Sequence, residues 1–205
     1  MGTPQPSQME RVVPGRCAGT LAGAVRVRLQ YVGFSRQQTG VRLLMAEPRR
    51  LDLSDPDTLR RVWELQRAAY AVEAELIGFA GIPPLHESLQ QLRDCGESFL
   101  GLDDETGLAG AVSWTRLHDG TLDICRLMVH PRAHRRGIAT TLLDSLDRLE
   151  PAARSVVATG TANLPALALY RRRGFTPAGI RQVGPATTVT LLERRTAPSR
   201  VPDDR

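Results

Sequence analysis

The amino-acid sequence predicts a mixed α/β domain, in which a sheet is covered by helices on both faces. Short apolar or alternating runs that are typical of strands are interleaved with longer stretches whose apolar residues recur at helical spacing. Turn residues separate these segments regularly from Arg49 onward. The order is strand, two helices, three strands, helix, strand, helix and two strands, and a chain of 205 residues suffices for one such domain.

The first half of this domain begins with a strand and ends with a hairpin. Asp55 followed by Pro56 is typical of the N-cap and first position of a helix. Asp119 and Gly120 give a turn signal between two strand-like runs, which predicts a hairpin. The candidate elements of this half are the strand Arg50–Leu53, a helix from Pro56, a short helix over Leu85–Leu92, and the strands Ser98–Leu102, Leu108–Arg116 and Thr121–His130.

The second half alternates strands with helices. Five apolar residues at helical spacing lead up to Pro151, which ends their helix. A later helix ends at Gly174, and the arginines in its last turn lie at the negative end of the helix dipole. The candidate elements of this half are the helix Ile138–Leu149, the strand Ser155–Thr159, the helix Leu164–Arg173, and the strands Thr176–Val183 and Ala186–Glu193.

Both ends of the chain are predicted to lie outside the folded domain, which would span residues 45–195. Residues 1–44 hold six of the 27 basic and one of the 22 acidic residues, so the remainder carries 21 of each and is neutral. We expect this basic extension to be disordered or not native, although the alternating run Val25–Tyr31 leaves a short strand open. Residues 196–205, rich in proline and charge, are expected to form a disordered tail.

The composition excludes several classes of function. All 27 basic residues are arginine, so there is no lysine for a P-loop, a Schiff base or a kinase strand. No apolar run approaches the roughly 18 residues of a membrane span. The net charge of +5 lies in the extension and aromatic residues make up 4%, which argues against nucleic-acid binding. The three cysteines are scattered, which favours a reducing cytoplasm and no bound metal.

The segment from Leu127 to Ala139 carries the clearest chemical signal. A buried-type strand leads into a basic turn with a glycine, and this turn opens an amphipathic helix. The first amide groups of a helix have no intrahelical acceptor, and the helix dipole favours an anion beside them. Gly137 keeps the backbone open for a close approach, while Arg135 and Arg136 add positive charge. This segment therefore predicts a cradle for a phosphate or pyrophosphate group.

Two motifs in the right order resemble the GCN5-related N-acetyltransferase (GNAT) family. The run His134-Arg-Arg-Gly-Ile-Ala139 follows Val129-His-Pro131 and is similar to the acetyl-CoA signature Gln/Arg-x-x-Gly-x-Gly/Ala, with His134 in place of Gln or Arg. The run Asn163-Leu-Pro-Ala-Leu-Ala-Leu-Tyr170-Arg-Arg-Arg-Gly-Phe175 is similar to the second family element. The resemblance implies the GNAT fold, a mixed, mostly antiparallel sheet of six to seven strands flanked by about four helices.

This resemblance also implies which residues hold and use acetyl-CoA. Backbone groups of Leu127, Met128 and Val129 would pair with the pantetheine arm, and an N–H there would hold the developing oxyanion. Asn163 would contact the cofactor arm, and the hydroxyl of Tyr170 would protonate the leaving thiolate. The residues that would bind the pyrophosphate are His134, Arg135, Arg136, Gly137, Ile138, Ala139 and Thr140.

The general base for the attacking amine is less well marked. Asp123 lies four residues before Leu127, and uninterrupted alternation would place both on one strand face, about 13 Å apart, a gap that water can bridge. His118 and Glu73 are further candidates, and a solvated surface position is the plain alternative for all three. In the family, the first two helices and the last two strands form the acceptor end. Here that end would contain Tyr70, Glu73, Glu75, Phe79, His86 and Glu87.

The sequence thus leads to an acetyl-CoA-dependent N-acetyltransferase of the cytoplasm, acting on a small-molecule or peptide amine by direct attack on the thioester. We expect no metal and no membrane segment, and a homodimer is left open. The first alternative is a non-catalytic coenzyme A-binding sensor or partner module of the same fold, against which Tyr170 argues because such a module needs no hydroxyl there. The second alternative, a basic nucleic-acid-binding protein, rests only on the arginines of the extension.

Overall fold

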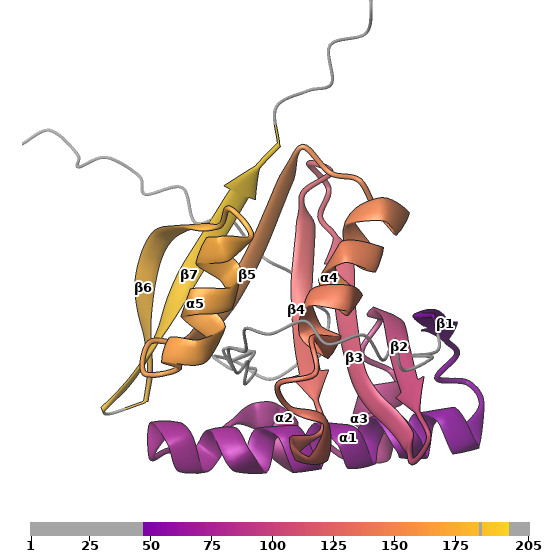
Figure 1. The fold of residues 1–205 in the computed structure, drawn as a ribbon. Helices are drawn as coiled ribbons and strands as arrows, with labels where there is room; N and C mark the ends of the chain where they lie inside the picture. Colours follow the sequence, from indigo (N-terminus) through magenta and orange to yellow (C-terminus); the bar gives the residue numbers. More distant parts are fainter. Residues whose placement is uncertain (1–46, 185, 197–205) are drawn as a thin grey trace, which may run out of the picture.

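The computed structural model describes residues 47–184 and 186–196, so the basic extension, the run Val25–Tyr31 and nearly all of the tail lie outside the described residues. The chain folds around one seven-stranded sheet with the strand order β1-β2-β3-β4-β5-β7-β6 (Figure 1). The strands are β1 Arg49–Leu51, β2 Ser98–Asp104, β3 Gly107–Arg116, β4 Leu122–Val129, β5 Arg154–Gly160, β6 Thr176–Gly184 and β7 Thr187–Arg195.

Within the described part of the chain, five α-helices and one 3-10 helix complete the fold. The helices are α1 Pro56–Ile77, α2 Pro83–His86, α3 Leu89–Arg93, η1 Pro131–Ala133, α4 Ile138–Leu149 and α5 Leu164–Arg172. The single short helix expected around Leu85 is therefore two helices. Ser88 and Gln91 form a capping box that starts α3 afresh, since each side chain accepts a backbone N–H of the other residue. The order of the remaining elements is the predicted one.

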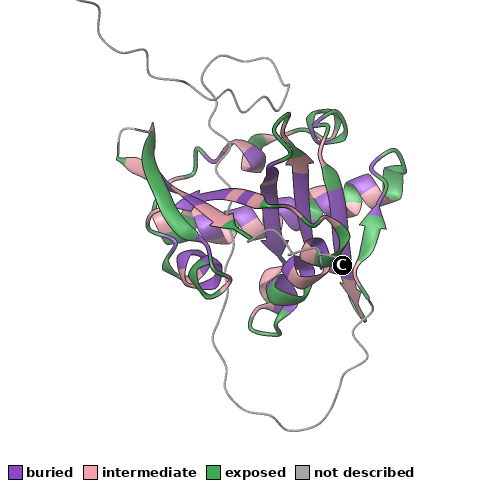
Figure 2. Ribbon diagram, turned by 90° about the horizontal axis from the view of Figure 1, so that it is seen from above, coloured by how far each residue is buried: buried purple, intermediate pink, exposed green. Residues whose placement is uncertain are grey.

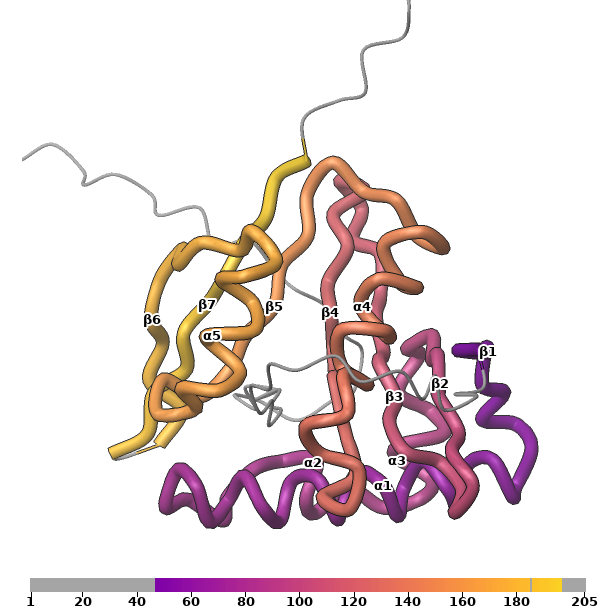
Figure 3. The backbone as a smooth tube through the Cα atoms, viewed as in Figure 1, coloured from indigo at the N-terminus to yellow at the C-terminus, as the bar shows by residue number. Residues whose placement is uncertain are grey.

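The sheet is mixed, as the sequence and the family resemblance predicted. Every neighbouring pair of strands is antiparallel except β4 and β5, which run parallel. A crossover through α4 joins these two strands, because parallel neighbours cannot be joined by a tight turn. This parallel pair lies in the middle of the sheet and divides it into β1–β4 on one side and β5–β7 on the other (Figure 3).

Helices cover both faces of the sheet and create two apolar cores. In Figure 1, α4 and α5 lie in front of the strands, and α1 runs across the bottom of the view with α2 and α3. One core joins α4 and α5 to residues such as Val112 and Leu127, and the other joins α1 to residues such as Ala111 and Met128. Figure 2 shows the central strands buried, whereas β6 at the edge of the sheet is largely exposed.

A β-bulge in β4 changes which side chains face which helices. Ser113 of β3 pairs with Arg126, but the next residue, Trp114, pairs with Ile124, so Cys125 is an extra residue in β4. Because of this extra residue, Leu122, Ile124 and Leu127 all belong to the α4 core, and Arg126 is turned to the α1 face, where its partner Gln66 of α1 lies. Among the described residues, no helix is long and apolar enough to cross a membrane.

The close contact of α4 with β3 predicts that Gly110 tolerates no larger residue. A Cβ atom at Gly110 would lie 2.6 Å from Ile138 Cγ2 and 3.0 Å from the backbone oxygen of Met128. We expect Gly110→Ala to lower the free energy of unfolding by about 1–3 kcal/mol, because overpacking forces the helix or the strand to shift. Urea-induced unfolding measures this change. The control is Gly179→Ala in β6, whose Cβ would meet Leu191 at an ordinary 3.8 Å, and an equal loss in both variants would contradict the prediction.

Candidate active site

The loop between β4 and α4 ends in an open helix N-terminus. Gly137 is the N-cap of α4 with φ of 80°, and no side chain caps the helix there. The first helical bond runs from the amide of Thr141 to the carbonyl of Gly137, at 3.0 Å, so the amides of residues 138–140 have no acceptor within the helix. A Cβ atom on Gly137 would meet no atom within 4 Å, so the space beside this N-cap is open. The predicted anion cradle is thus an uncapped helix start, and its binding of a phosphate group stays a prediction.

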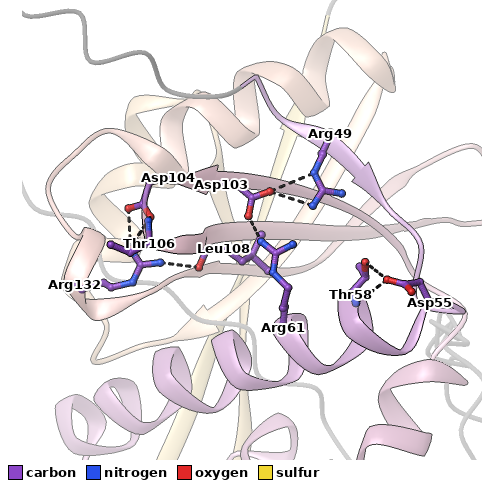
Figure 4. A network of polar contacts seen from close by, with 9 residues as sticks. All are labelled: Arg49, Asp55, Thr58, Arg61, Asp103, Asp104, Thr106, Leu108 and Arg132. Atoms are coloured by element: carbon purple, nitrogen blue, oxygen red, sulfur yellow. Dashed lines mark hydrogen bonds and ion pairs between the residues drawn. The ribbon is translucent and has the colours of Figure 1, made fainter.

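Arginine side chains fasten this loop to the end of β2. Arg132 donates to both carboxylate oxygens of Asp104 at 2.7 Å, and Arg136 donates to one of them, also at 2.7 Å (Figure 4 draws the contact of Arg132). Burial opposes ionisation of Asp104, but the bonds from Arg132, Thr106 and Arg136 outweigh it and hold its pKa well below the usual range. The charge of Arg136 is therefore shared with the protein's own carboxylate. Arg135 adopts a φ of 65°, which is uncommon for a residue other than glycine.

His134 braces the same loop against β4. Its ring nitrogen Nε2 lies 3.3 Å from the backbone oxygen of Val129. Burial lowers the pKa of His134, although the bond to Val129 acts in the opposite direction, so the ring is neutral at pH 7 and Nε2–H donates to that oxygen. This residue replaces the Gln or Arg of the family signature and connects the cradle to the last residue of β4.

β4 and β5 are paired along only three residues. The pairs are Leu122 with Ser155, Asp123 with Val156 and Ile124 with Val157. Beyond them β4 continues to Val129 and stays paired with β3 on its other side, while β5 continues to Gly160 and stays paired with β7. Past Ile124 and Val157, the two strands face each other without pairing. Their facing backbone edges have no strand partner among the described residues. Leu127, Met128 and Val129, expected to pair with the pantetheine arm, all lie on this edge of β4.

The start of α5 contributes Asn163 to the opening between these strands. Its side-chain oxygen accepts the amide of Ala166 at 3.1 Å and caps α5. Its side-chain nitrogen donates to Glu73 Oε1 at 3.3 Å, which joins α5 to α1. Asn163 is only 1% exposed. The side-chain amide that was expected to contact the cofactor arm therefore already has a protein partner at each end.

Glu73 is a buried carboxyl group in the same region. It is 4% exposed, and burial raises its pKa to about 9, against the smaller opposite effect of the bond from Asn163. Neither Glu73 Oε2 nor the hydroxyl of Thr159, two residues past the last β4–β5 pair, has a hydrogen-bond partner among the described residues. A small pocket here is lined by Ala69, Val72, Glu73, Leu76, Val129, His134 and Asn163. Glu73 was expected at the acceptor end, but it lies beside residues predicted to bind acetyl-CoA.

Tyr170 lies in the last turns of α5 and is fully buried. Its ring packs edge-on against Phe175, with 5.6 Å between the ring centroids, and both residues belong to the α4–α5 core. Ala166, Leu167 and Leu169 from the same helix are also in this core. The ring is therefore held by packing, which fixes the position of its hydroxyl.

The bulge in β4 corrects one expectation about Asp123. Uninterrupted alternation placed Asp123 and Leu127 on the same strand face, but the extra residue Cys125 moves them to opposite faces. Asp123 faces the side to which Arg126 points and is half-buried. His118, the other candidate base on this hairpin, is exposed in the turn before β4, next to the end where β4 and β5 are paired.

A buried arginine that the sequence analysis missed lies on the α1 face. Arg126 is 2% exposed and donates to Glu97 Oε2 at 2.8 Å, to Glu87 and to Gln66. Burial would lower its pKa, but the two carboxylates outweigh burial and raise it. A second pocket beside it is lined by Pro83, Pro84, His86, Glu87, Gln91 and Arg126. The interrupted apolar alternation at positions 122, 124, 127 and 129 is the sequence signal that could have revealed this site.

The other residues expected at the acceptor end are spread out. Tyr70 of α1 is buried, whereas Glu75 of the same helix is exposed. Phe79 meets the β6–β7 turn, since a Cβ on Gly184 would lie 3.2 Å from its ring. Cys95 and Cys125 are both buried in the reduced form. Within residues 47–184 and 186–196, no group of three His, Cys, Asp or Glu side chains could hold a metal ion.

Comparison with known proteins gives consistent matches. The model of the acetyltransferase (GNAT) family matches residues 42–175. The UPF0157 protein YqkA of Bacillus subtilis (strain 168) is 39% identical over 118 residues, which are 57% of this chain and 34% of that protein, so the chain spans about a third of this relative's length.

Two solved structures show the same fold. The ribosomal-protein-S18-alanine N-acetyltransferase from Escherichia coli has a TM-score of 0.59 and 17% identity, covering 75% of this chain and 97% of that one. PaiA N-acetyltransferase from Thermoplasma acidophilum, in complex with coenzyme A, has a TM-score of 0.55 and 16% identity, covering 73% and 98%.

The raised pKa of Glu73 predicts a pH-dependent effect of Glu73→Gln on stability. The carboxyl group ionises near 4.5 in the unfolded chain and near 9 in the folded protein, so between these values folding takes up a proton and stability falls as the pH rises. The amide needs no proton, so the variant is spared this loss. We expect the free energy of unfolding of Glu73→Gln, relative to that of wild type, to be higher at pH 8 than at pH 5 by an amount on the order of a few kcal/mol. Urea-induced unfolding at both pH values checks this. Glu75→Gln on the exposed face of α1 is the control, and a Glu73→Gln effect independent of pH would contradict the prediction.

Proposed function

Since the chain belongs to the acetyltransferase (GNAT) family, we propose that it is an N-acetyltransferase that uses acetyl-CoA as its donor substrate. The observation that carries this proposal is the open N-terminus of α4 beside the unpaired edge of β4. The helix N-terminus can bind a pyrophosphate through backbone amides, and the strand edge can pair with an extended, amide-bearing arm. Few ligands other than a coenzyme A thioester carry both groups at the two ends of one chain.

The residues present fit this substrate. The amides at the start of α4 and the space in front of Gly137 suit the pyrophosphate. The backbone of Leu127, Met128 and Val129 would pair with the pantetheine arm. Buried polar atoms without partners, Glu73 Oε2 and the Thr159 hydroxyl, lie by the opening, and a polar ligand would relieve the cost of burying them.

The reaction we propose is direct attack of an amine on the thioester carbonyl. A backbone N–H of the free β4 edge would hold the oxyanion that forms, and a donor fixed in a strand needs no reorganisation for this task. The hydroxyl of Tyr170 would then protonate the thiolate as it leaves. A phenol with a reference pKa near 10 is a weak acid toward a thiolate whose acid has a pKa near 8.5, so the transfer requires a closely held hydroxyl. The burial and packing of Tyr170 support such a fixed position.

The amine itself would enter from the α1 face. The pocket beside Arg126 lies on this face, and Glu87 and Glu97 together carry one more charge than the arginine between them. This excess attracts a cationic amine, either a small molecule or a peptide N-terminus. Asp123 lies on the same face and would accept the amine's proton through water, which keeps it as the proposed base. An assay of free thiol release from acetyl-CoA over a panel of amines tests the function, and donor binding without turnover of any amine would favour a non-catalytic coenzyme A-binding module.

Replacing Gly137 with tryptophan is expected to abolish donor binding. The side chain would project into the open space at Gly137, next to the α4 amides proposed to bind the pyrophosphate. Acetyl-CoA at a hundred times its Kd should stabilise the wild type by about 2.7 kcal/mol, seen as a rise in Tm, and the variant should show no rise. Gly120→Trp is a matched control, because Gly120 has a φ of 77° against 80° for Gly137 and is equally open. Equal stabilisation of both variants would remove the cradle from the proposal.

Tyr170→Phe is expected to lower turnover while leaving donor affinity nearly unchanged. The substitution keeps the ring against Phe175 and removes only the hydroxyl. General acid catalysis is worth about 10²–10⁴-fold, so kcat should fall by a factor in that range. Steady-state kinetics with several amines at saturating acetyl-CoA measures this fall, and a parallel binding titration checks the affinity. Wild-type rates with every amine would make Tyr170 a packing residue.

A further inference from the structure

Glu73 has no part in the reaction proposed above, yet it lies at the opening between β4 and β5. Its carboxyl group comes from α1, is 4% exposed and lines the small pocket with Val129 and His134. Glu73 Oε1 accepts a bond from Asn163, whereas Oε2 has no partner among the described residues. A buried polar atom left without a partner costs roughly 1–3 kcal/mol. This oxygen therefore indicates a ligand atom that completes the pocket.

The lining of the pocket indicates which part of the ligand this is. Val129 is the last residue of the β4 edge, His134 belongs to the cradle loop and Asn163 opens α5. The pocket therefore lies between the edge proposed to pair with the pantetheine arm and the cradle proposed to bind the pyrophosphate. The stretch of acetyl-CoA between those two points carries amide and hydroxyl groups and no charge.

We propose that Glu73 is a donor-binding residue, whose Oε2–H donates a hydrogen bond to an amide carbonyl of the pantetheine arm while Oε1 keeps its bond from Asn163. This inference rests on the proposed function, because it assigns a role in the same site. Since Oε1 accepts from Asn163, a proton on the carboxyl group belongs on Oε2, the oxygen that faces no protein partner. The bond would tie α1 to the donor substrate, and through Asn163 to α5.

The pKa of Glu73 supports the role of a donor. Burial raises this pKa to about 9, so the group is protonated and uncharged at pH 7. An uncharged carboxylic acid can donate a hydrogen bond to the uncharged pantetheine arm without the cost of burying a charge. Above the pKa the carboxylate can only accept, so the donated bond is lost.

Few other groups titrate in the relevant range. His134, across the pocket, has a pKa lowered by burial and stays neutral above pH 7. Tyr70 precedes Glu73 by one turn of α1 and Tyr170 lies on α5. Both tyrosines are unchanged in Glu73→Gln, so any part they have in the pH dependence appears in that variant as well. Arg135 and Arg136 of the cradle keep their charge throughout. A change in affinity between pH 7.5 and 9.5 that is present in wild type and absent in Glu73→Gln therefore reports on Glu73.

Binding titrations with two probes test this proposal. The first probe is a non-hydrolysable thioether analogue of acetyl-CoA, and the second is adenosine 3′-phosphate 5′-diphosphate, which reaches the cradle but has no pantetheine arm. At pH 7.5 we expect Glu73→Leu to bind the analogue about tenfold more weakly than wild type does. It should bind the second probe with the same affinity as wild type. Glu73→Gln keeps a neutral donor and should stay within about twofold of wild type for both probes. Glu75→Gln, on the exposed face of α1, is the matched control and should change neither affinity.

The pH dependence supplies an independent readout. The affinity of wild type for the analogue should fall about fourfold from pH 7.5 to 9.5, as Glu73 ionises, and that of Glu73→Gln should stay level. Equal affinities of wild type and Glu73→Leu for the analogue would overturn the role of Glu73 and leave the proposed function intact. If neither probe bound wild type, the proposed function itself would fail. If Glu73→Leu does not fold, the pH series alone decides. A wild-type affinity for the analogue that stays as constant between pH 7.5 and 9.5 as that of Glu73→Gln would then overturn the proposal.

Discussion

The early end of pairing between β4 and β5 is the constraint on which the rest of the site depends. A strand in the middle of a sheet normally forms backbone hydrogen bonds with a neighbouring strand along each of its two edges. Here β4 keeps β3 along its whole length but loses β5 after Ile124. The backbone beyond Ile124 is therefore left with donors and acceptors in a largely buried position, and a ligand that presents a complementary edge can satisfy them.

The bulge at Cys125 has a second effect at the same point. By adding one residue, it turns Arg126 toward α1 and keeps Leu127 in the α4 core. The arginine is buried because Glu87, Glu97 and Gln66 surround it with acceptors, and a buried ion of this kind is tolerated only when its bonds are complete. One irregularity in one strand thus places a buried cluster of charged groups under α1, directly beside the backbone edge of the site.

The sequence allowed much of the fold to be predicted, because its signals are local. Asp55 with Pro56, Gly137 and Asn163 mark helix starts through chemistry that depends on neighbouring residues alone. The roles of Arg126 and Glu73 could not be predicted in this way. Both are charged residue types that are exposed in most proteins, and their burial results from contacts with residues far away in the chain, Glu97 for the first and Asn163 for the second. The position of Asp123 was mistaken for a related reason, since a bulge interrupts alternation without a strong local signal.

The contact between α4 and β3 at Gly110 fixes the position of the open N-terminus of α4. Because Ile138, the first residue of α4, lies against Gly110, the start of the helix is tied to the strands β1–β4. Within the sheet, β5–β7 are joined to these strands by the three β4–β5 pairs. Across the helices, Arg173 and Arg194 bind Asp147 of α4, and α5 shares one apolar core with α4. The spacing between Tyr170 and the α4 amides, and with it the length of ligand that can reach both, is therefore set by side-chain packing between two helices and not by the sheet alone.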